Sequence, residues 1–284
     1  MSRIFEALKK SGTSDIVEEP GASGDATELS QQASTGPVAL GNCGAFALSS
    51  IPQERLVCVT DEHGLAAEKV RVLATKLRHL AGRRPLKKLL VTSSMKGEGK
   101  SIISANLAIT LAKHSHARVL LLDGDLRQPT LDEKLGCASE KSLADWWSEN
   151  TPVEQVLRKE STLPLWFLPA GKFPGQPLKA LQSSRFSDLV AQLNELFDWI
   201  VIDSPPLNPL ADSRVLGSVA DGVMIVVRER FTQVELLNQA IEAVEPKKLL
   251  GLVMNDTSVS ESRYFPAYYQ YAPKATDKQV AATA

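Results

Sequence analysis

The stretch that decides the fold reads Ser94-Met95-Lys96-Gly97-Glu98-Gly99-Lys100-Ser101. A short apolar run, Leu89–Thr92, precedes it, and a helical pattern, Ile102–Lys113, follows it. Gly97 and Gly99 allow the backbone to bend so that its N–H groups face phosphate oxygens, and the N-terminus of the following helix adds a positive dipole end. The order of strand, glycine-rich turn and helix therefore predicts a phosphate-binding loop, or P-loop.

The P-loop pattern gives individual residues a role. Lys100 is expected to reach the β- and γ-phosphates of ATP, and the Ser101 hydroxyl is expected to ligate Mg²⁺. Ser94 stands where the pattern G-x-x-x-x-G-K-[ST] has its first glycine, and Glu98 occupies a variable position to which we assign no catalytic role. The predicted nucleotide contacts in this stretch come from Ser94, Lys96, Gly97, Glu98, Gly99, Lys100, Ser101 and Ile102.

Apolar runs alternate with helical patterns along the rest of the chain. Further strands are predicted at Arg118–Leu122, Leu165–Leu168, Trp199–Ile202, Val223–Val227 and Leu249–Met254. Further helices are predicted over Arg185–Phe197 and Gln233–Val244, and before the first strand, where Leu65, Val72, Leu73, Leu77 and Leu80 suggest an amphipathic helix. Runs of Val, Ile and Leu without alternation indicate strands that are covered on both faces. We therefore predict an α/β fold with a doubly wound, mostly parallel sheet, which binds ligands at the carboxyl ends of its strands.

Two acidic motifs follow predicted strands. Asp123, Asp125 and Arg127 come after Arg118–Leu122, and Asp203 comes after Trp199–Ile202. Two carboxylates two residues apart at a strand end can both face a metal–phosphate centre, and Arg127 can neutralise phosphate charge or pair with an acid. An acid after an apolar strand, downstream of a P-loop, is the expected direct or indirect partner of Mg²⁺. Each acidic motif alone is a weak signal, but the three motifs in this order are a strong one.

The two ends of the chain differ in composition from the sheet region. Ser11–Ser50 is rich in Gly, Ser, Ala, Thr and Gln, so we predict that residues 1–60 form a short helix and a flexible linker, followed by one domain over 61–256. Residues 257–284 are predicted to be a flexible tail, which holds every tyrosine of the chain: Tyr264, Tyr268, Tyr269 and Tyr271. From the residues alone, this tail is equally an aromatic docking segment or a modification site.

Composition excludes several functional classes. The formal net charge of −1 gives no strong field that would recruit nucleic acid. The three cysteines, Cys43, Cys58 and Cys137, have neither metal-ligand nor CxxC spacing, which fits a reducing compartment. No apolar run reaches 18 residues, and the N-terminus lacks the apolar core of a signal peptide. We therefore expect a protein that stays in the cytoplasm.

Together these motifs resemble those of the bacterial tyrosine kinases (BY-kinases) of capsule and exopolysaccharide synthesis. Residues 92–101 resemble their Walker A motif, residues 120–129 their Walker A′ motif and residues 200–206 their Walker B motif, and the resemblance covers roughly residues 65 to 272. Met95 stands where the related partitioning ATPases carry a signature lysine, which favours the kinase branch. Glu68 and Arg71 match the family's E-x-x-R-x-x-R assembly motif, but its last position is Ala74, which puts ring assembly through that motif in doubt.

The resemblance implies an ATP- and Mg²⁺-dependent protein-tyrosine kinase that phosphorylates its own tail tyrosines between subunits and regulates polysaccharide synthesis or export. Lys100 would stabilise the transferring phosphoryl group. The metal would be held by Ser101, Asp123 and Asp203. Either Asp123 or Asp125 would orient the acceptor hydroxyl. Arg127 and Asn255 would complete the nucleotide site, and Asn255 matches a position that contacts adenine in related ATPases.

The resemblance also implies partners and a location. The implied partners are a membrane-embedded polysaccharide co-polymerase as activator, a second copy of the chain and a phosphotyrosine phosphatase, with no nucleic acid. They place the protein at the inner face of the plasma membrane. Two alternatives fit parts of the pattern: a partitioning-type ATPase, opposed by Met95 and the tyrosine tail, and a degenerate nucleotide-binding regulator. The intact Lys100, Ser101 and three aspartates oppose the degenerate regulator.

Overall fold

The computed structural model describes residues 40–48, 56–115, 117–137 and 139–257. The predicted N-terminal helix, most of the predicted linker and the tyrosine tail therefore lie outside the described residues.

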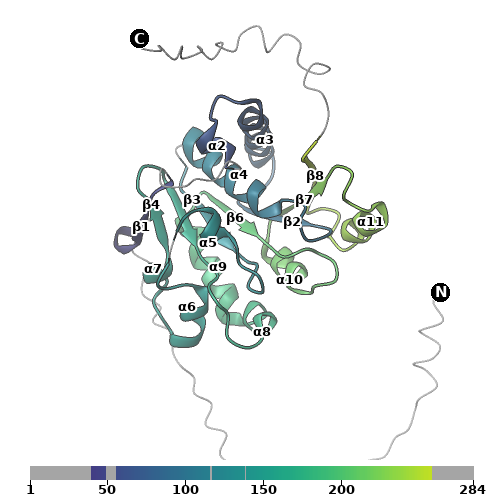
Figure 1. The fold of residues 1–284 in the computed structure, drawn as a ribbon. Helices are drawn as coiled ribbons and strands as arrows, with labels where there is room; N and C mark the ends of the chain where they lie inside the picture. Colours follow the sequence, from purple (N-terminus) through teal and green to yellow (C-terminus); the bar gives the residue numbers. More distant parts are fainter. Residues whose placement is uncertain (1–39, 49–55, 116, 138, 258–284) are drawn as a thin grey trace, which may run out of the picture. The chain divides into compact units, whose positions relative to one another are not determined.

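An eight-stranded sheet with the strand order β1-β4-β5-β3-β6-β2-β7-β8 forms the centre of the fold (Figure 1). Neighbouring strands are parallel except for β4 and β5, which pair antiparallel. Each strand predicted from the sequence is present, so the predicted mostly parallel α/β sheet is confirmed. The strands are β1 (Gly44–Phe46), β2 (Lys88–Ser93), β3 (Val119–Asp123), β4 (Arg158–Glu160), β5 (Leu165–Leu168), β6 (Trp199–Asp203), β7 (Gly222–Arg228) and β8 (Leu249–Asn255).

Helices cover both faces of this sheet. Those on one face are α2 (Val57–Thr60), α3 (Leu65–Ala81), α4 (Lys100–Ser115) and α5 (Leu131–Lys134). Those on the other are α6 (Leu143–Glu149), α7 (Val153–Val156), α8 (Pro177–Leu181), α9 (Ser184–Leu196), α10 (Asp212–Val219) and α11 (Val234–Glu242). Strand β3 shows the alternation: Leu120 and Leu122 pack in one hydrophobic layer, whereas Val119 and Leu121 pack in the other. The fold is therefore doubly wound, as predicted.

Helix α4, which follows the P-loop, is covered on two sides. It packs against β2, β3 and β6 and, on its opposite side, against α3 (Figure 1). Buried alanines and leucines such as Ala105, Leu107, Ala108 and Leu111 allow these close contacts. A helix enclosed in this way holds its N-terminus in a fixed position at the carboxyl edge of the sheet.

The prediction of a flexible linker within residues 1–60 is wrong near the C-terminal end of that range. Residues 44–46 form β1, which pairs with β4, and Phe46 and Leu48 are buried. The Glu160 carboxylate accepts a hydrogen bond from the Leu48 backbone N–H (3.3 Å), which fixes this segment to the end of β4. A three-residue strand is too short to show a period, and its pairing depends on β4, a charged segment that the sequence analysis did not predict.

Within the described part of the chain, every helix is too short or too polar to cross a bilayer.

Candidate nucleotide-binding and phosphotransfer site

The P-loop connects β2 to α4 through residues 94–99. Gly97 and Gly99 have φ angles of 92° and 94°, a region that side chains other than glycine rarely adopt. A Cβ atom at Gly99 would also lie 2.1 Å from the Asn255 amide nitrogen. That nitrogen donates a hydrogen bond to the Glu98 carbonyl oxygen (2.9 Å), so Asn255 supports the loop from the end of β8. Both glycines are therefore required by the shape of the loop.

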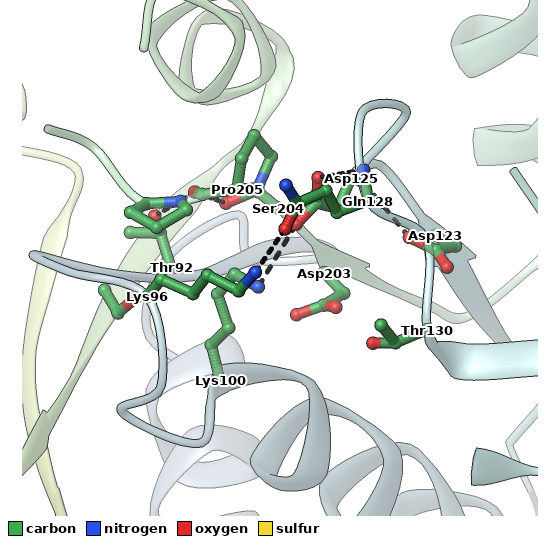
Figure 2. Close-up of polar contacts among 12 residues, drawn as sticks. Thr92, Lys96, Lys100, Asp123, Asp125, Gln128, Thr130, Asp203, Ser204 and Pro205 are labelled. Atoms are coloured by element: carbon green, nitrogen blue, oxygen red, sulfur yellow. Dashed lines mark hydrogen bonds and ion pairs between the residues drawn. The ribbon is translucent and has the colours of Figure 1, made fainter. Parts of the chain in front are cut away.

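The three Walker motifs meet because their strands are neighbours. Strand β6 lies between β2 and β3, and the register places Asp203 opposite both Val91 and Asp123. The Lys100 ammonium group lies 3.3 Å from Asp125 Oδ2, and both side chains are largely buried (Figure 2). The sheet thus brings the predicted Lys100, Asp123, Asp125 and Asp203 to one edge.

Asp203 is 1% exposed and accepts a hydrogen bond from the Ser104 hydroxyl (3.0 Å). Burial raises the pKa of the Asp203 carboxyl. The Lys100 cation and hydrogen bonds from the Ser101 and Ser104 hydroxyls partly oppose that rise. The charged form of Asp203 is therefore costly in free energy. It lies beside Ser101, another predicted metal ligand.

Asp123 is equally buried, and its partners are backbone groups. Its carboxylate accepts hydrogen bonds from the N–H groups of Asp125 (3.1 Å) and Leu131 (3.4 Å). Burial raises the pKa of Asp123 well above its usual value, and the neighbouring charge of Asp203 raises it further. Two buried carboxyl groups side by side favour a cation between them.

These residues fit Mg²⁺. The carboxylates of Asp123 and Asp203 and the hydroxyl of Ser101 are hard oxygen donors, which Mg²⁺ prefers. Proteins commonly bind Mg²⁺ through one or two carboxylates together with substrate phosphates and water. Among the described residues there is no cluster of three or more His, Cys, Asp or Glu that could hold a metal.

A second lysine links the P-loop to the A′ loop, which we define as residues 124–130. Figure 2 shows Lys96 reaching Gln128, whose amide oxygen lies 2.5 Å from the ammonium group. The Gln128 backbone N–H donates in turn to Asp125 (3.1 Å). Lys96 and Lys100 therefore both point toward the A′ loop.

Comparison with known proteins identifies the family. Residues 87–250 match the AAA domain family, AAA_31. Over 218 residues the chain is 30% identical to the tyrosine-protein kinase YwqD of Bacillus subtilis, an alignment that covers 76% of this chain and 92% of that protein. The chain belongs to the bacterial tyrosine-protein kinase family.

Solved structures share the fold of this chain. The chain is similar to the VpsO kinase domain, with 27% identity, a TM-score of 0.61 and coverage of 69% of this chain and 98% of that one. It also superposes on the chimeric protein CapA2B2 with a TM-score of 0.67, 24% identity and coverage of 74% and 92%, which shows the fold alone.

In this kinase-family member, Arg127 pairs with an acid. Its guanidinium group donates two hydrogen bonds (3.1 and 3.0 Å) to Asp212 Oδ2, a buried carboxylate at the start of α10. The sequence left two roles open for Arg127, phosphate or acid, and the structure shows the contact with the acid. This pair fixes the A′ loop against α10.

A pocket of about 610 Å³ lies beside the P-loop, a volume within the usual range of about 300–1,000 Å³ for small-molecule sites. Predicted nucleotide residues Gly97, Gly99, Ile102 and Asn255 line it. Apolar side chains of α3 and β8, including Leu73 and Leu252, form much of the remaining wall. Ser94 is buried, its hydroxyl contacts Glu98, and it is not among the residues that line this pocket.

Sequence analysis missed several residues of the site. Ser104 lies one helical turn after Lys100, a spacing that could have revealed it. Gln128 carried no such signal, because its contact with Lys96 spans 32 residues. Lys134, whose ammonium group donates to the Thr130 carbonyl (3.3 Å) in the A′ loop, has a pKa that is lowered by burial. The four predicted phosphoacceptor tyrosines lie outside the described residues.

Proposed function

We propose that the protein is an ATP-dependent protein-tyrosine kinase that phosphorylates the tail tyrosines of a second copy of the chain. The observation that carries this proposal is the convergence of Lys100 and Asp125, 3.3 Å apart, with two buried carboxyl groups at the edge of the sheet beside the P-loop. Phosphoryl transfer depends mainly on positioning and charge stabilisation, so this small set of groups is chemically sufficient.

Lys100 performs the central electrostatic role. Its ammonium group is paired with Asp125. Bound phosphate competes for the same cation, which then stabilises the charge on the transferring γ-phosphoryl group. The backbone N–H groups of the P-loop and the N-terminus of α4 hold the other phosphate oxygens. Mg²⁺, held by Ser101, Asp123 and Asp203, would supply further positive charge at the phosphates.

The two A′ acids have different surroundings, which suggests a division of roles. Both oxygens of Asp123 are occupied by backbone N–H groups beneath the A′ loop. Asp125 is less buried, and its partners are Lys100 and the Gln128 backbone. Once phosphate engages Lys100, Asp125 is the acid that can accept a hydrogen bond from an incoming hydroxyl.

The reaction balances with these groups. The tyrosine oxygen forms a bond to the γ-phosphorus, the bond between that phosphorus and the bridging oxygen breaks, and ADP leaves. Asp125 takes the tyrosine proton. The proposed acceptors are Tyr264, Tyr268, Tyr269 and Tyr271, and several phosphates within this short segment would repel one another and the acidic site.

The proposed cellular role is regulation of capsule or exopolysaccharide synthesis or export at the inner face of the plasma membrane. A membrane-embedded co-polymerase protein would activate the kinase, and a phosphotyrosine phosphatase would reverse its action. The family membership supports this role.

Incubation of the full chain with γ-labelled ATP, followed by mapping of the label, tests the proposal. The expected product is phosphotyrosine in the tail. ATP hydrolysis without phosphotyrosine, even with a membrane activator, would instead indicate a partitioning-type ATPase. A failure to bind nucleotide would indicate a degenerate regulator.

A further inference from the structure

The Glu98 side chain is fully buried (0% exposed), although it belongs to the loop that surrounds the nucleotide site. Ionised carboxylates are rarely buried unless hydrogen bonds compensate them. Glu98 has such bonds, and they come from two separate parts of the chain.

The first set of bonds lies within the P-loop. The Ser94 hydroxyl lies 2.9 and 3.1 Å from the two carboxylate oxygens, and the Met95 backbone N–H donates to Oε2 (2.7 Å). The Glu98 side chain therefore connects the C-terminal part of the P-loop to its start at Ser94 and Met95. A glycine at position 94, which the general pattern has, would remove this hydroxyl. The departure at Ser94 and the burial of Glu98 are parts of one arrangement.

The second set of bonds comes from the segment between β7 and α11. The Thr232 hydroxyl contacts Glu98 Oε1, and the same hydroxyl accepts a hydrogen bond from the Arg228 backbone N–H (2.9 Å). Because its oxygen is engaged as an acceptor, the single hydroxyl proton is directed to Glu98. Thr232 thus connects the P-loop to a segment 134 residues away.

Two further contacts hold the same bend from outside. The Asn255 side chain donates to the Glu98 carbonyl (2.9 Å), and the Arg228 guanidinium group lies 3.5 Å from the Gly97 carbonyl. The P-loop bend is therefore supported by residues at the ends of β7 and β8.

We propose that Glu98 is a positioning residue for phosphate binding. Through Ser94 and Thr232 it fixes the bend at Gly97–Gly99, so that the N–H groups of the loop face the phosphates without first having to be ordered. The proposal rests on the proposed function, since it assumes that this loop binds ATP. A preorganised site binds more tightly because less conformational freedom is lost on binding.

Thr232→Val tests the connection with the smallest change, because it replaces the hydroxyl with a methyl group of similar size. We expect the Kd for ATP·Mg²⁺, measured by calorimetry on the full chain, to rise about 10-fold, the loss expected for one hydrogen bond to a charged group. Turnover at saturating ATP should change far less than Kd, since Thr232 does not contact the reacting atoms. Thr232→Ser, which keeps the hydroxyl, should restore the wild-type Kd.

Glu98→Ala removes the whole arrangement and should raise Kd further, by about 100-fold. Glu235→Ala, at an exposed position in the first turn of α11, is the matched control and should leave Kd unchanged. Amide hydrogen exchange of nucleotide-free protein gives a second readout: residues 95–99 should exchange faster in Thr232→Val than in wild type.

Two results would overturn the inference. The first is wild-type affinity and wild-type exchange at residues 95–99 in Thr232→Val. The second is a Thr232→Ser protein as weak as Thr232→Val, which would show that the hydroxyl has no part. Failure of the proposed function would look different, because the wild-type chain itself would then bind no ATP or transfer no phosphate.

Discussion

Buried carboxyl groups lie on both sides of the P-loop, but they differ in how far hydrogen bonds compensate their charge. On the outer side, toward the ends of β7 and β8, the Glu98 carboxylate is surrounded by hydrogen-bond donors from Ser94, Met95 and Thr232. On the inner side, toward β3 and β6, Asp123 and Asp203 lie opposite each other, and burial raises the pKa values of both. The charge of Asp203 raises the pKa of Asp123 further, and the charge of Asp125 raises that of Asp203. The outer carboxylate is balanced by hydrogen-bond donors, whereas burial makes the charged forms of the two inner carboxyl groups costly in free energy.

This difference distinguishes residues that fix the conformation of the P-loop from residues that are proposed to bind metal or transfer phosphate. A satisfied carboxylate contributes to a fixed shape. Carboxylates held together at a cost in free energy mark a site prepared for a ligand. Substitutions on the inner side should therefore affect chemistry most and stability least.

Lys100→Met should give the largest effect. The γ-phosphoryl group loses its fixed cation, so phosphoryl transfer should fall by roughly 1,000-fold. Turnover with γ-labelled ATP measures the loss, and circular dichroism checks that the domain is folded. Activity equal to wild type would show that Lys100 has no role in phosphoryl transfer.

Asp123→Asn should separate activity from stability. Transfer should fall by roughly 100-fold, because a carboxylate that serves Mg²⁺ is lost. The free energy of unfolding should stay about equal, because removing a buried charge offsets the loss of an acceptor for one of the two backbone N–H groups that Asp123 binds. Chemical denaturation measures it. A clear loss of stability would show that the Asp123 carboxylate, like that of Glu98, stabilises the fold through its hydrogen bonds.

The pH dependence of stability follows from the raised pKa of Asp123, whose ordinary value is 3.8. Above that pH the unfolded chain has released the proton, whereas the folded chain still holds it. The stabilisation is therefore complete at low pH and is lost as the pH rises through the raised pKa of the folded state. Relative to wild type, Asp123→Asn should gain stability as the pH rises from about 4. A difference that is independent of pH would contradict the shift.

Arg127→Ala should give a smaller effect, mainly on stability. It leaves the buried Asp212 carboxylate without its guanidinium partner, and Asp212 Oδ1 has no partner among the described residues. Because Arg127 is partly exposed, we expect a loss of about 1–2 kcal/mol in unfolding free energy. Asp212→Asn in the same protein should recover part of it. Unchanged stability in the single variant would show that Arg127 contributes little to holding the A′ loop.

Sequence predicted the inner side better than the outer side. Val, Ile and Leu runs located β2, β3 and β6, and parallel pairing then required Asp123 and Asp203 to meet at one edge. The outer side depends on contacts between distant segments, such as Thr232 with Glu98, which no local pattern contains. The same reason hid β1, a three-residue strand defined by its partner.

We propose that the inner side of the P-loop transfers phosphate to tyrosine on another copy of the chain. Mixing two variants distinguishes this from transfer within one chain. One carries Lys100→Met and keeps its tail, and the other is active but has phenylalanine in place of Tyr264, Tyr268, Tyr269 and Tyr271. With γ-labelled ATP, and with a membrane activator where one is needed, we predict labelled phosphotyrosine in the tail of the Lys100→Met chain. An unlabelled tail there, beside wild-type protein that labels itself normally, would contradict transfer between subunits.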